Sequence, residues 1–366
     1  MIDTTKHIVD FKNANDLSNL KDGSVSLVVT SPPYPMIEMW DDSFAAQNPA
    51  IGKALEKNDS DDTFELMHQV LDKVWEECYR VLHQGGIACI NIGDATRTVK
   101  KKFQLFPNHA RIISSFLDLG FSNLPNIIWR KQTNAPNKFM GSGMLPPGAY
   151  VTLEHEFILV FRKGNKREFS SKNKPNRRES SYFWEERNKW FSDLWDFKGT
   201  SQLLSKNEIR NRSGAYPFDV PYRLINMFSV RGDLVLDPFL GTGTTTLAAI
   251  AAGRNSIGYE LEEEFQKIIQ KNLLAKENLN SINDTVRQRI LNHKNFTDDR
   301  IEAKGENSVK YTNEFFDFPV MTRQEKKLIL QFINSIEQVN ENSFQASYIK
   351  KALMDYQGRH SLFAQV

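Results

Sequence analysis

Residues 27–40, LVVTSPPYPMIEMW, place a hydroxyl, two adjacent prolines and an aromatic ring directly after an apolar run. Proline cannot continue a sheet ladder and restricts the residue before it, so Ser31-Pro32-Pro33-Tyr34 forms a rigid turn where a buried strand ends. A purely structural turn seldom needs both prolines at such a point. The pattern therefore predicts a turn that holds its carbonyl groups and its tyrosine ring in fixed positions toward a ligand.

A second stretch, DPFLGTGTTT, joins an apolar strand to a helix over residues 237–246. Gly241 and Gly243 let the backbone approach a ligand closely, and the helix N-terminus behind them favours a carboxylate or a phosphate. The stretch is not a phosphate loop, because no GK[ST] follows, and the third glycine of a dinucleotide fingerprint is replaced by Thr246. Glu260 ends the next strand, about 20 residues on, where an acidic residue commonly holds ribose hydroxyls. The pattern predicts a nucleoside ligand rather than a dinucleotide.

Apolar strands alternate with amphipathic helices around both turns. Strands are predicted over residues 24–30, 87–94, 126–131, 156–163, 234–237 and 256–260, and helices over residues 62–83 and 107–119, from 216, from the glycine turn to Gly253, and over 262–277. This β-α-β alternation favours a parallel sheet. The predicted fold class is α/β, with the glycine turn beyond the carboxyl ends of the strands, where such folds bind ligands.

The composition is that of an ordinary globular protein. The chain has 366 residues, 40% of them apolar and 25% charged, and a formal net charge of +2, so any nucleic-acid surface must be local. The first residues lack the features of a signal peptide and no apolar run can span a bilayer, which predicts a cytoplasmic protein. Only Cys78 and Cys89 are present, and no spacing resembles a metal site, so neither a disulfide framework nor a metal is expected.

With both turns in view, the chain resembles the β group of amino-methylating DNA methyltransferases. In that family an Asp-Pro-Phe-x-Gly-x-Gly-Thr-Thr turn binds S-adenosylmethionine, and an (Asp/Asn/Ser)-Pro-Pro-(Tyr/Phe) turn holds the target base. Here they are residues 237–245 and 31–34, in the permuted order of the β group, with a polar insert between them. The resemblance covers roughly residues 8–275. It implies a Rossmann-like methyltransferase fold, with a mixed, mostly parallel sheet, helices on both faces and a target-recognition insert.

The resemblance also implies a set of cofactor-binding residues. They are Asp237, Pro238, Phe239, Gly241, Gly243, Thr244, Glu260, Phe218 and Pro221. Phe218 and Pro221 match the segment before the cofactor turn, whose helix start helps to cradle the methionine part. The family tends to place an acidic residue near the chain start to touch adenine, and here the candidates for that contact are Asn13 and Asp16.

The same resemblance implies that Ser31, Pro32, Pro33 and Tyr34 act on a base flipped out of duplex DNA. The lone pair of an exocyclic amine is delocalised into the ring, and an acceptor on each N–H frees it to attack the sulfonium methyl in line. The Ser31 hydroxyl and the Pro32 carbonyl supply those acceptors, and Tyr34 stacks on the base. Asp94, at the same sheet edge, either polarises Ser31, accepts the leaving proton or caps a helix.

Serine at the first position of the turn favours cytosine N4, although related enzymes with the same turn act on adenine N6. The string TSPPYPMIEMWD is similar to N4-cytosine enzymes that act on CTAG. Carbon-5 methylation needs a thiolate nucleophile, and Cys78 and Cys89 lie in apolar patterns. We expect N4 methylation of cytosine in duplex DNA, which protects against a restriction endonuclease that need not bind this protein. The alternatives are adenine-N6 methylation and a DNA-binding relative that transfers no methyl.

A basic run opens the polar insert and is expected to contact DNA phosphates. Its residues are Arg162, Lys163, Lys166, Arg167, Lys172, Lys174, Arg177 and Arg178. The predicted domains are a catalytic half (1–163), the target-recognition insert (164–212), a cofactor-binding half (213–278) and a peripheral helical tail (279–366). In the tail we expect a polar linker near 296–311 and a helix from Thr322, whose spacing to Glu325 resembles a capping box.

Overall fold

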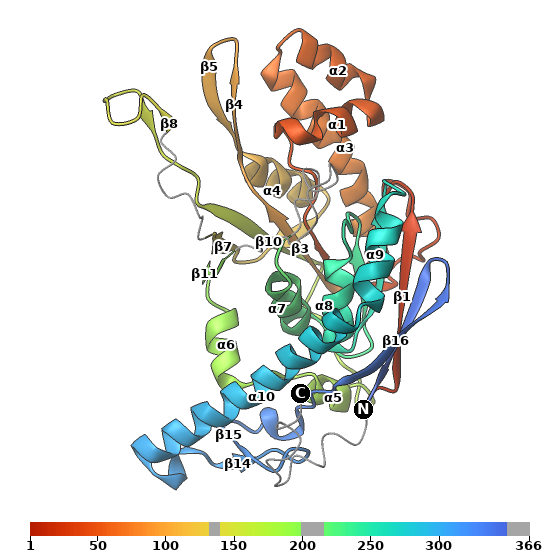
Figure 1. Cartoon of the computed structure of the whole chain (residues 1–366), viewed down its shortest axis with the longest axis vertical. Helices are drawn as coiled ribbons and strands as arrows, with labels where there is room; N and C mark the ends of the chain where they lie inside the picture. The colour runs from red at the N-terminus through yellow and green to blue at the C-terminus, as the bar shows by residue number, and fades with distance from the viewer. Residues whose placement is uncertain (132–139, 199–215, 350–366) are drawn as a thin grey trace.

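A large mixed sheet runs through residues 1–131, 140–198 and 216–349, which the computed structural model describes (Figure 1). In spatial order the strands are β11 (Leu194–Asp196), β7 (Ile127–Arg130), β10 (His155–Lys163), β3 (Leu82–Ile92), β2 (Val25–Thr30), β12 (Leu234–Asp237), β13 (Asn255–Glu260), β1 (Thr4–Phe11), β17 (Ser343–Tyr348) and β16 (Ile333–Asn340), and β6 (Phe121–Asn123) also pairs with β10. The neighbours from β3 to β1 are parallel, whereas β10 and β17 run antiparallel to them. The predicted mixed α/β sheet is confirmed.

Helices cover both faces of this sheet. One face carries α1 (Asp41–Gln47), α2 (Pro49–Glu56), α3 (Ser60–Val81) and α4 (Asn108–Asp118), and the other carries α7 (Asp219–Phe228), α8 (Thr244–Ala252), α9 (Phe265–Leu274) and the start of α10 (Lys276–Lys304). In β2 all six residues are buried. Val28 packs on the face that carries α1–α4, while Leu27 and Val29 pack on the face that carries α7–α9. A strand covered on both faces is apolar throughout for this reason. No helix in the described ranges is long and apolar enough to cross a membrane.

The parallel strands bring the two turns to one edge of the sheet. β2 and β12 are hydrogen-bonded neighbours, and the chain leaves them at Ser31 and at Pro238. β13 and β1 lie next along the sheet and end at Glu260 and Phe11, at the same edge. Because these strands share a direction, all four following segments meet at the carboxyl edge, where open α/β sheets bind ligands.

Two hairpins also project beyond the sheet, as Figure 1 shows. One consists of β4 (Ala95–Val99) and β5 (Lys102–Phe106), and the other of β8 (Met140–Gly141) and β9 (Ala149–Tyr150). The first hairpin follows the carboxyl end of β3, and the second precedes β10, which is antiparallel to β3. Both therefore belong to the same edge as the two turns.

The described part of the insert contains α5 (Lys174–Glu179), α6 (Trp184–Trp190) and β11. β11 pairs in parallel with β7, so the insert supplies the edge strand at one end of the main sheet. The predicted boundary between residues 212 and 213 lies outside the described residues.

The tail differs from the expected helical one. α10 continues to Lys304 through the predicted linker, because Val286, Ile290 and His293 keep a buried stripe at helical spacing. Only a short 3-10 helix, η4 (Glu325–Lys327), follows Thr322, although the Thr322 N–H does donate to Glu325 at 2.7 Å. The tail also contains η3 (Glu306–Ser308), β14 (Tyr311–Thr312) and β15 (Pro319–Val320), and its β16 and β17 extend the main sheet beyond β1.

Polar side chains fasten this tail to α6. Glu185, His293 and Glu325 are buried and have ligand atoms within 4.8 Å of one another. The His293 ring nitrogens lie 3.0 Å from Glu185 Oε1 and 3.0 Å from the Pro319 carbonyl, and Glu325 accepts from the Trp184 N–H at 2.8 Å. Both ring nitrogens are thus engaged by protein atoms. We interpret the group as a set of buried hydrogen bonds between α6 and the tail, and not as a metal site.

A buried ion pair joins the same elements. Arg289 of α10 donates to the two carboxylate oxygens of Glu186 in α6 at 2.6 and 2.8 Å, and to the Tyr222 hydroxyl at 3.0 Å. Both charged side chains are almost fully covered. Breaking such a pair leaves an uncompensated charge in the interior.

We predict that Glu186→Ala lowers the free energy of unfolding by about 3–5 kcal/mol, because it leaves the buried Arg289 guanidinium without a carboxylate partner. Urea unfolding followed by circular dichroism measures the effect. The matched control is Asp284→Ala, which removes an exposed partner of Arg287 on the same helix and should leave the midpoint within error of the wild type. Equal midpoints for both variants would contradict this account of the tail.

Candidate active site

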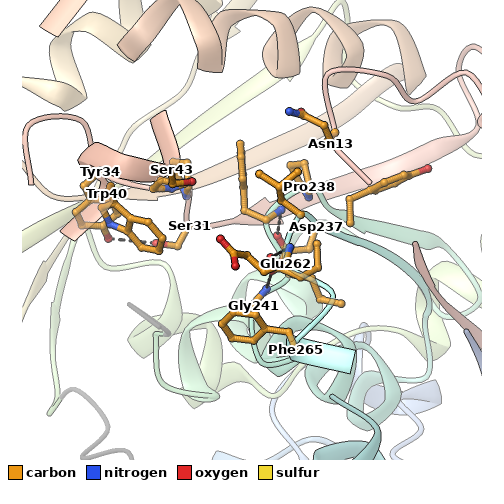
Figure 2. A pocket seen from close by; sticks show the side chains of 18 of the residues that line it. Asn13, Ser31, Tyr34, Trp40, Ser43, Asp237, Pro238, Gly241, Glu262 and Phe265 are labelled. Carbon is orange, nitrogen blue, oxygen red and sulfur yellow. Dashed lines mark hydrogen bonds between the residues drawn. The ribbon is translucent and has the colours of Figure 1, made fainter. Parts of the chain in front are cut away.

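A cavity of about 680 Å³ joins the two turns at the carboxyl edge of the sheet. Figure 2 shows Ser31 and Tyr34 at one end, with Trp40 and Ser43 beside them, and the glycine turn at the other. The predicted site residues that line it are Ser31, Pro32, Pro33, Tyr34, Asp237, Pro238, Phe239, Gly241, Thr244, Glu260 and Asn13. The structure thus brings the two predicted turns around one space.

A buried hydrogen bond fixes the turns relative to each other. The hydroxyl of Thr30, the last residue of β2, donates to Asp237 Oδ1 at 2.5 Å, and the Phe239 N–H donates to the same oxygen at 3.0 Å. The other carboxylate oxygen accepts from the Thr245 hydroxyl at 2.5 Å. Burial raises the pKa of Asp237, and these bonds to its charged form oppose the rise. Asp237 therefore uses its acceptors to hold both turns at the base of the cavity.

The glycine turn depends on two left-handed residues, Gly241 with φ of +54° and Gly243 with φ of +86°. A Cβ on Gly241 would meet no atom within 4 Å, so open space lies directly over its backbone. A Cβ on Gly243 would lie 3.4 Å from Cγ2 of Ile269 in α9. Gly241 therefore faces the cavity, whereas Gly243 supplies the left-handed backbone from which α8 begins.

The carboxylate of Glu260 closes the other side of this turn. It accepts from the Gly241 N–H at 2.8 Å and from the Glu262 N–H at 3.0 Å. Burial raises the pKa of Glu260, and the backbone bonds favour its charged form. The carboxylate is thus held at the cavity wall, in the position where the sequence predicts a ribose contact.

These features fit the adenosyl cofactor that the resemblance implies. Leu261 and Phe265 give the cavity an apolar wall beside the carboxylate of Glu260, as a purine and a ribose require. The open space over Gly241 lies at the N-terminus of α8, which favours a carboxylate. Glu260, Asn13 and Phe265 would hold the nucleoside, and the glycine turn would hold the methionine part.

At the opposite end of the cavity, a polar network fixes the Ser31–Tyr34 turn from behind. The Tyr34 hydroxyl donates to Glu156 Oε2 at 3.0 Å and lies 3.2 Å from the Ser31 hydroxyl. The side-chain amide of Asn91 donates to the Tyr34 oxygen at 2.9 Å and to Glu156 Oε2 at 2.8 Å. Lys131 forms an ion pair with the other oxygen of Glu156. Burial and the neighbouring Glu156 charge raise the pKa of Tyr34 well above its usual value.

The donors in this network can be assigned in order. Because the single proton of Tyr34 is directed to Glu156, Ser31 must be the donor in its contact with Tyr34. The chain therefore runs from Ser31 to Tyr34 to Glu156. The serine oxygen also lies 3.4 Å from the Asn91 amide nitrogen, and it keeps a lone pair available as an acceptor. A chain that ends in a carboxylate makes that oxygen a stronger acceptor.

Asp94 does not take part in this network, contrary to its predicted polarising role. Its carboxylate accepts from the His109 N–H at 3.1 Å and lies 2.8 Å from the His109 ring nitrogen. It therefore caps the first turn of α4, which is the helix-capping alternative. Glu156 occupies the place behind Ser31 that the sequence assigned to Asp94.

The remaining cofactor candidates separate into two groups. Asn13 lines the cavity, whereas the Asp16 carboxylate caps its own loop by accepting from the Ser18 N–H at 2.9 Å. Phe218 and Pro221 are not among the cavity-lining residues of the described ranges. Tyr216, two residues before Phe218, does line it.

Several residues of the cavity and of the network behind Ser31 were not predicted from the sequence. Asn91 interrupts the apolar run IACINIG, and a buried amide in such a strand needs partners, which is a signal of function. Glu156 lies near the start of β10 and Lys131 directly follows β7, and neither belongs to a sequence motif. Trp40 and Ser43 line the cavity next to the turn, but nothing in their spacing marks them.

Both cysteines are buried, and neither lines the cavity. Burial raises the pKa of both thiols, so neither is set up as the thiolate nucleophile that carbon-5 methylation requires.

The basic run lies at the amino edge of the sheet, away from the cavity. Lys163 donates to the Leu82 carbonyl at 2.8 Å, where α3 gives way to β3, and Arg167 pairs with Asp233 just before β12 at 2.6 and 2.9 Å. These contacts hold the chain together at the ends of the strands opposite to Ser31. The structure therefore places Arg162, Lys163, Lys166, Arg167, Lys172, Lys174, Arg177 and Arg178 at the edge of the sheet opposite to the cavity, which argues against their predicted contact with DNA.

The comparisons with known proteins agree with this geometry. A family model described as DNA methylase, N6_N4_Mtase, matches residues 25–271. The type II methyltransferase M.MthZI of Methanothermobacter thermautotrophicus is 52% identical over 347 residues, which cover 94% of this chain and 95% of that protein. The type II methyltransferase M.MjaI of Methanocaldococcus jannaschii is 51% identical over 285 residues, which cover 75% and 93%.

Solved structures similar to this one also include DNA methyltransferases. TTHA0409 from Thermus thermophilus, a protein crystallised with S-adenosyl-L-methionine, has a TM-score of 0.56 and 32% identity, with 73% of this chain and 94% of that chain covered. The PvuII DNA methyltransferase, at 16% identity and a TM-score of 0.52, covers 75% of this chain and 88% of its own and shows the fold alone. The chain belongs to the N6_N4 DNA methylase family, and it is an S-adenosylmethionine-dependent DNA methyltransferase.

Proposed function

We propose that the protein methylates the exocyclic N4 amine of cytosine at a specific site in duplex DNA. The observation that carries this proposal is the Ser31 hydroxyl, whose O–H donates to Tyr34 in the chain that ends at Glu156, and which faces the same cavity as the glycine turn. The serine in place of aspartate or asparagine at the first position of the turn supports cytosine over adenine. The identity to type II methyltransferases supports a role in protecting DNA against a restriction endonuclease that reads the same site.

In the proposed reaction the target base is flipped out of the duplex and lies against the Tyr34 ring. The Ser31 oxygen accepts one N–H of the amine and the Pro32 carbonyl accepts the other, so the nitrogen lone pair leaves conjugation with the ring. The bound cofactor supplies the methyl group. As the N–C bond forms and the S–C bond breaks, the nitrogen loses one proton to solvent. The protein contributes position and fixed dipoles, which cost no reorganisation during the reaction.

Adenine N6 is the second candidate, because the family name includes both amines. We take CTAG as the proposed recognition sequence, from the likeness of residues 30–41 to N4-cytosine enzymes. The experiment that decides is incubation of unmethylated duplexes, with and without CTAG, with S-adenosylmethionine, followed by mass spectrometry of the nucleosides. N4-methylcytosine in the CTAG duplex supports the proposal. N6-methyladenine, or no methylated base, would overturn it.

We predict that Gly241→Asp abolishes S-adenosylmethionine binding while the fold persists. Aspartate tolerates the left-handed backbone better than most residues, but its carboxylate would enter the space over the turn where the anionic end of the cofactor is expected. Isothermal calorimetry measures the affinity. Gly143→Asp is the matched control, since Gly143 has φ of +65° and equally open surroundings, and it should bind like the wild type. Normal binding by Gly241→Asp would remove the turn from the cofactor site.

We predict that Ser31→Ala slows methyl transfer by about a hundredfold or more, the scale for loss of one preorganised group at a reacting centre. Cofactor affinity should not change, because the glycine turn holds that ligand. Single-turnover transfer to duplex DNA gives the rate. Ser24→Ala, at the opposite end of β2, is the control and should react like the wild type. A near wild-type rate for Ser31→Ala would show that the serine only shapes the turn.

A further inference from the structure

The β4–β5 hairpin is anchored at both ends to the turn that carries Ser31. Before the hairpin, the backbone of Gly93 lies against the Tyr34 ring, since a Cβ there would come within 3.0 Å of it. After the hairpin, the Asn108 amide donates to the Pro35 carbonyl at 3.1 Å and to the Gly93 carbonyl at 2.9 Å. Arg97 in β4 also pairs with both oxygens of Asp41, next to the cavity residues of α1. The hairpin therefore rises from the rim of the cavity.

The β8–β9 hairpin is anchored to the same rim. It lies in the chain between Lys131 and Glu156, two cavity residues that form an ion pair with each other. The Phe103 ring of β5 stacks on the Tyr150 ring of β9, with centroids 4.4 Å apart and planes 14° from parallel. This stack joins the two hairpins, which we call the paired hairpins (95–106 and 140–150).

The paired hairpins expose charge and apolar surface side by side. Lys100 and Lys101 form the turn between β4 and β5, and Lys102 begins β5; all three are exposed, and none of the three has an ion pair with a described residue. The turn between β8 and β9 exposes Met144 by 84% and Leu145 by 71%. Large apolar side chains this exposed at the tip of a projecting turn are unusual on a soluble surface.

We propose that the paired hairpins bind duplex DNA beside the cavity. Lys100–Lys102 contact the phosphates, and Met144 and Leu145 enter a groove. This inference rests on the proposed function, because a base must reach the cavity from a duplex at its rim. Three adjacent ammonium groups complement a phosphate backbone. Unbranched and branched apolar side chains on a projecting turn are the type that proteins insert between base steps. A bound protein partner would use the apolar turn but would not need the lysines.

The first test replaces Lys100, Lys101 and Lys102 with Ala and measures DNA affinity across a salt series. The slope of log affinity against log salt should fall by about two to three, from about 0.9 for each phosphate contact. The matched control replaces Lys172, Lys174 and Arg178 with Ala, which removes the same charge from the exposed surface at the amino edge, and its slope should not change. Cofactor binding measured by calorimetry should stay normal in both.

The second test is Met144→Ser with Leu145→Ser, on duplexes with and without a mismatch opposite the target base. The salt slope should stay the same, while affinity for the matched duplex falls more than affinity for the mismatched one, which is easier to flip. An unchanged slope in the lysine variant, while the wild type methylates DNA, would overturn this inference alone. Absence of methyl transfer by the wild type would overturn the proposed function, and the inference with it.

Discussion

The site depends on one constraint, which is that β2 and β12 are parallel neighbours in the sheet. Because they share a direction, the turns that follow them leave at the same edge, although 207 positions separate Thr30 from Asp237 in the chain. The Thr30–Asp237 hydrogen bond of 2.5 Å fixes the distance between the turns. The cavity between the Ser31–Tyr34 turn and the glycine turn follows from this adjacency, and the proposed in-line transfer requires it.

A second, smaller network fixes the end of the cavity at which we propose that the base binds. Glu156 comes from β10 and Asn91 from β3, the strands beyond β2, and both reach behind the Ser31–Tyr34 turn. The carboxylate orders the hydroxyl groups so that the serine oxygen presents lone pairs to the cavity. The two prolines fix the backbone, and the network fixes the side chains. Rigid placement of this kind is what electrostatic catalysis needs, since no dipole has to turn during the reaction.

Sequence patterns identified the elements that carry rigid motifs and missed those defined by long-range pairing. The turns at Ser31 and Gly241 were predictable because proline and glycine restrict or free the backbone locally. Glu156 was not, because its role depends on β10 lying antiparallel to β3. Likewise β16 and β17 join the sheet only through β1, whose mixed polar sequence gives a weak strand signal. The position of the basic run was not predictable for a similar reason: its charge is visible in the sequence, but its place at the amino edge is set by tertiary contacts.

The most direct measurement is the single-turnover rate of methyl transfer by Glu156→Gln. Glutamine keeps the size of the side chain but removes the charge at the end of the Ser31–Tyr34 chain, so the rate should fall at least about tenfold with unchanged cofactor affinity. Glu154→Gln, two residues away on the exposed surface, controls for loss of a carboxylate and should react like the wild type. Equal rates for Glu156→Gln and the wild type would contradict the claim that this network prepares Ser31 for the reaction.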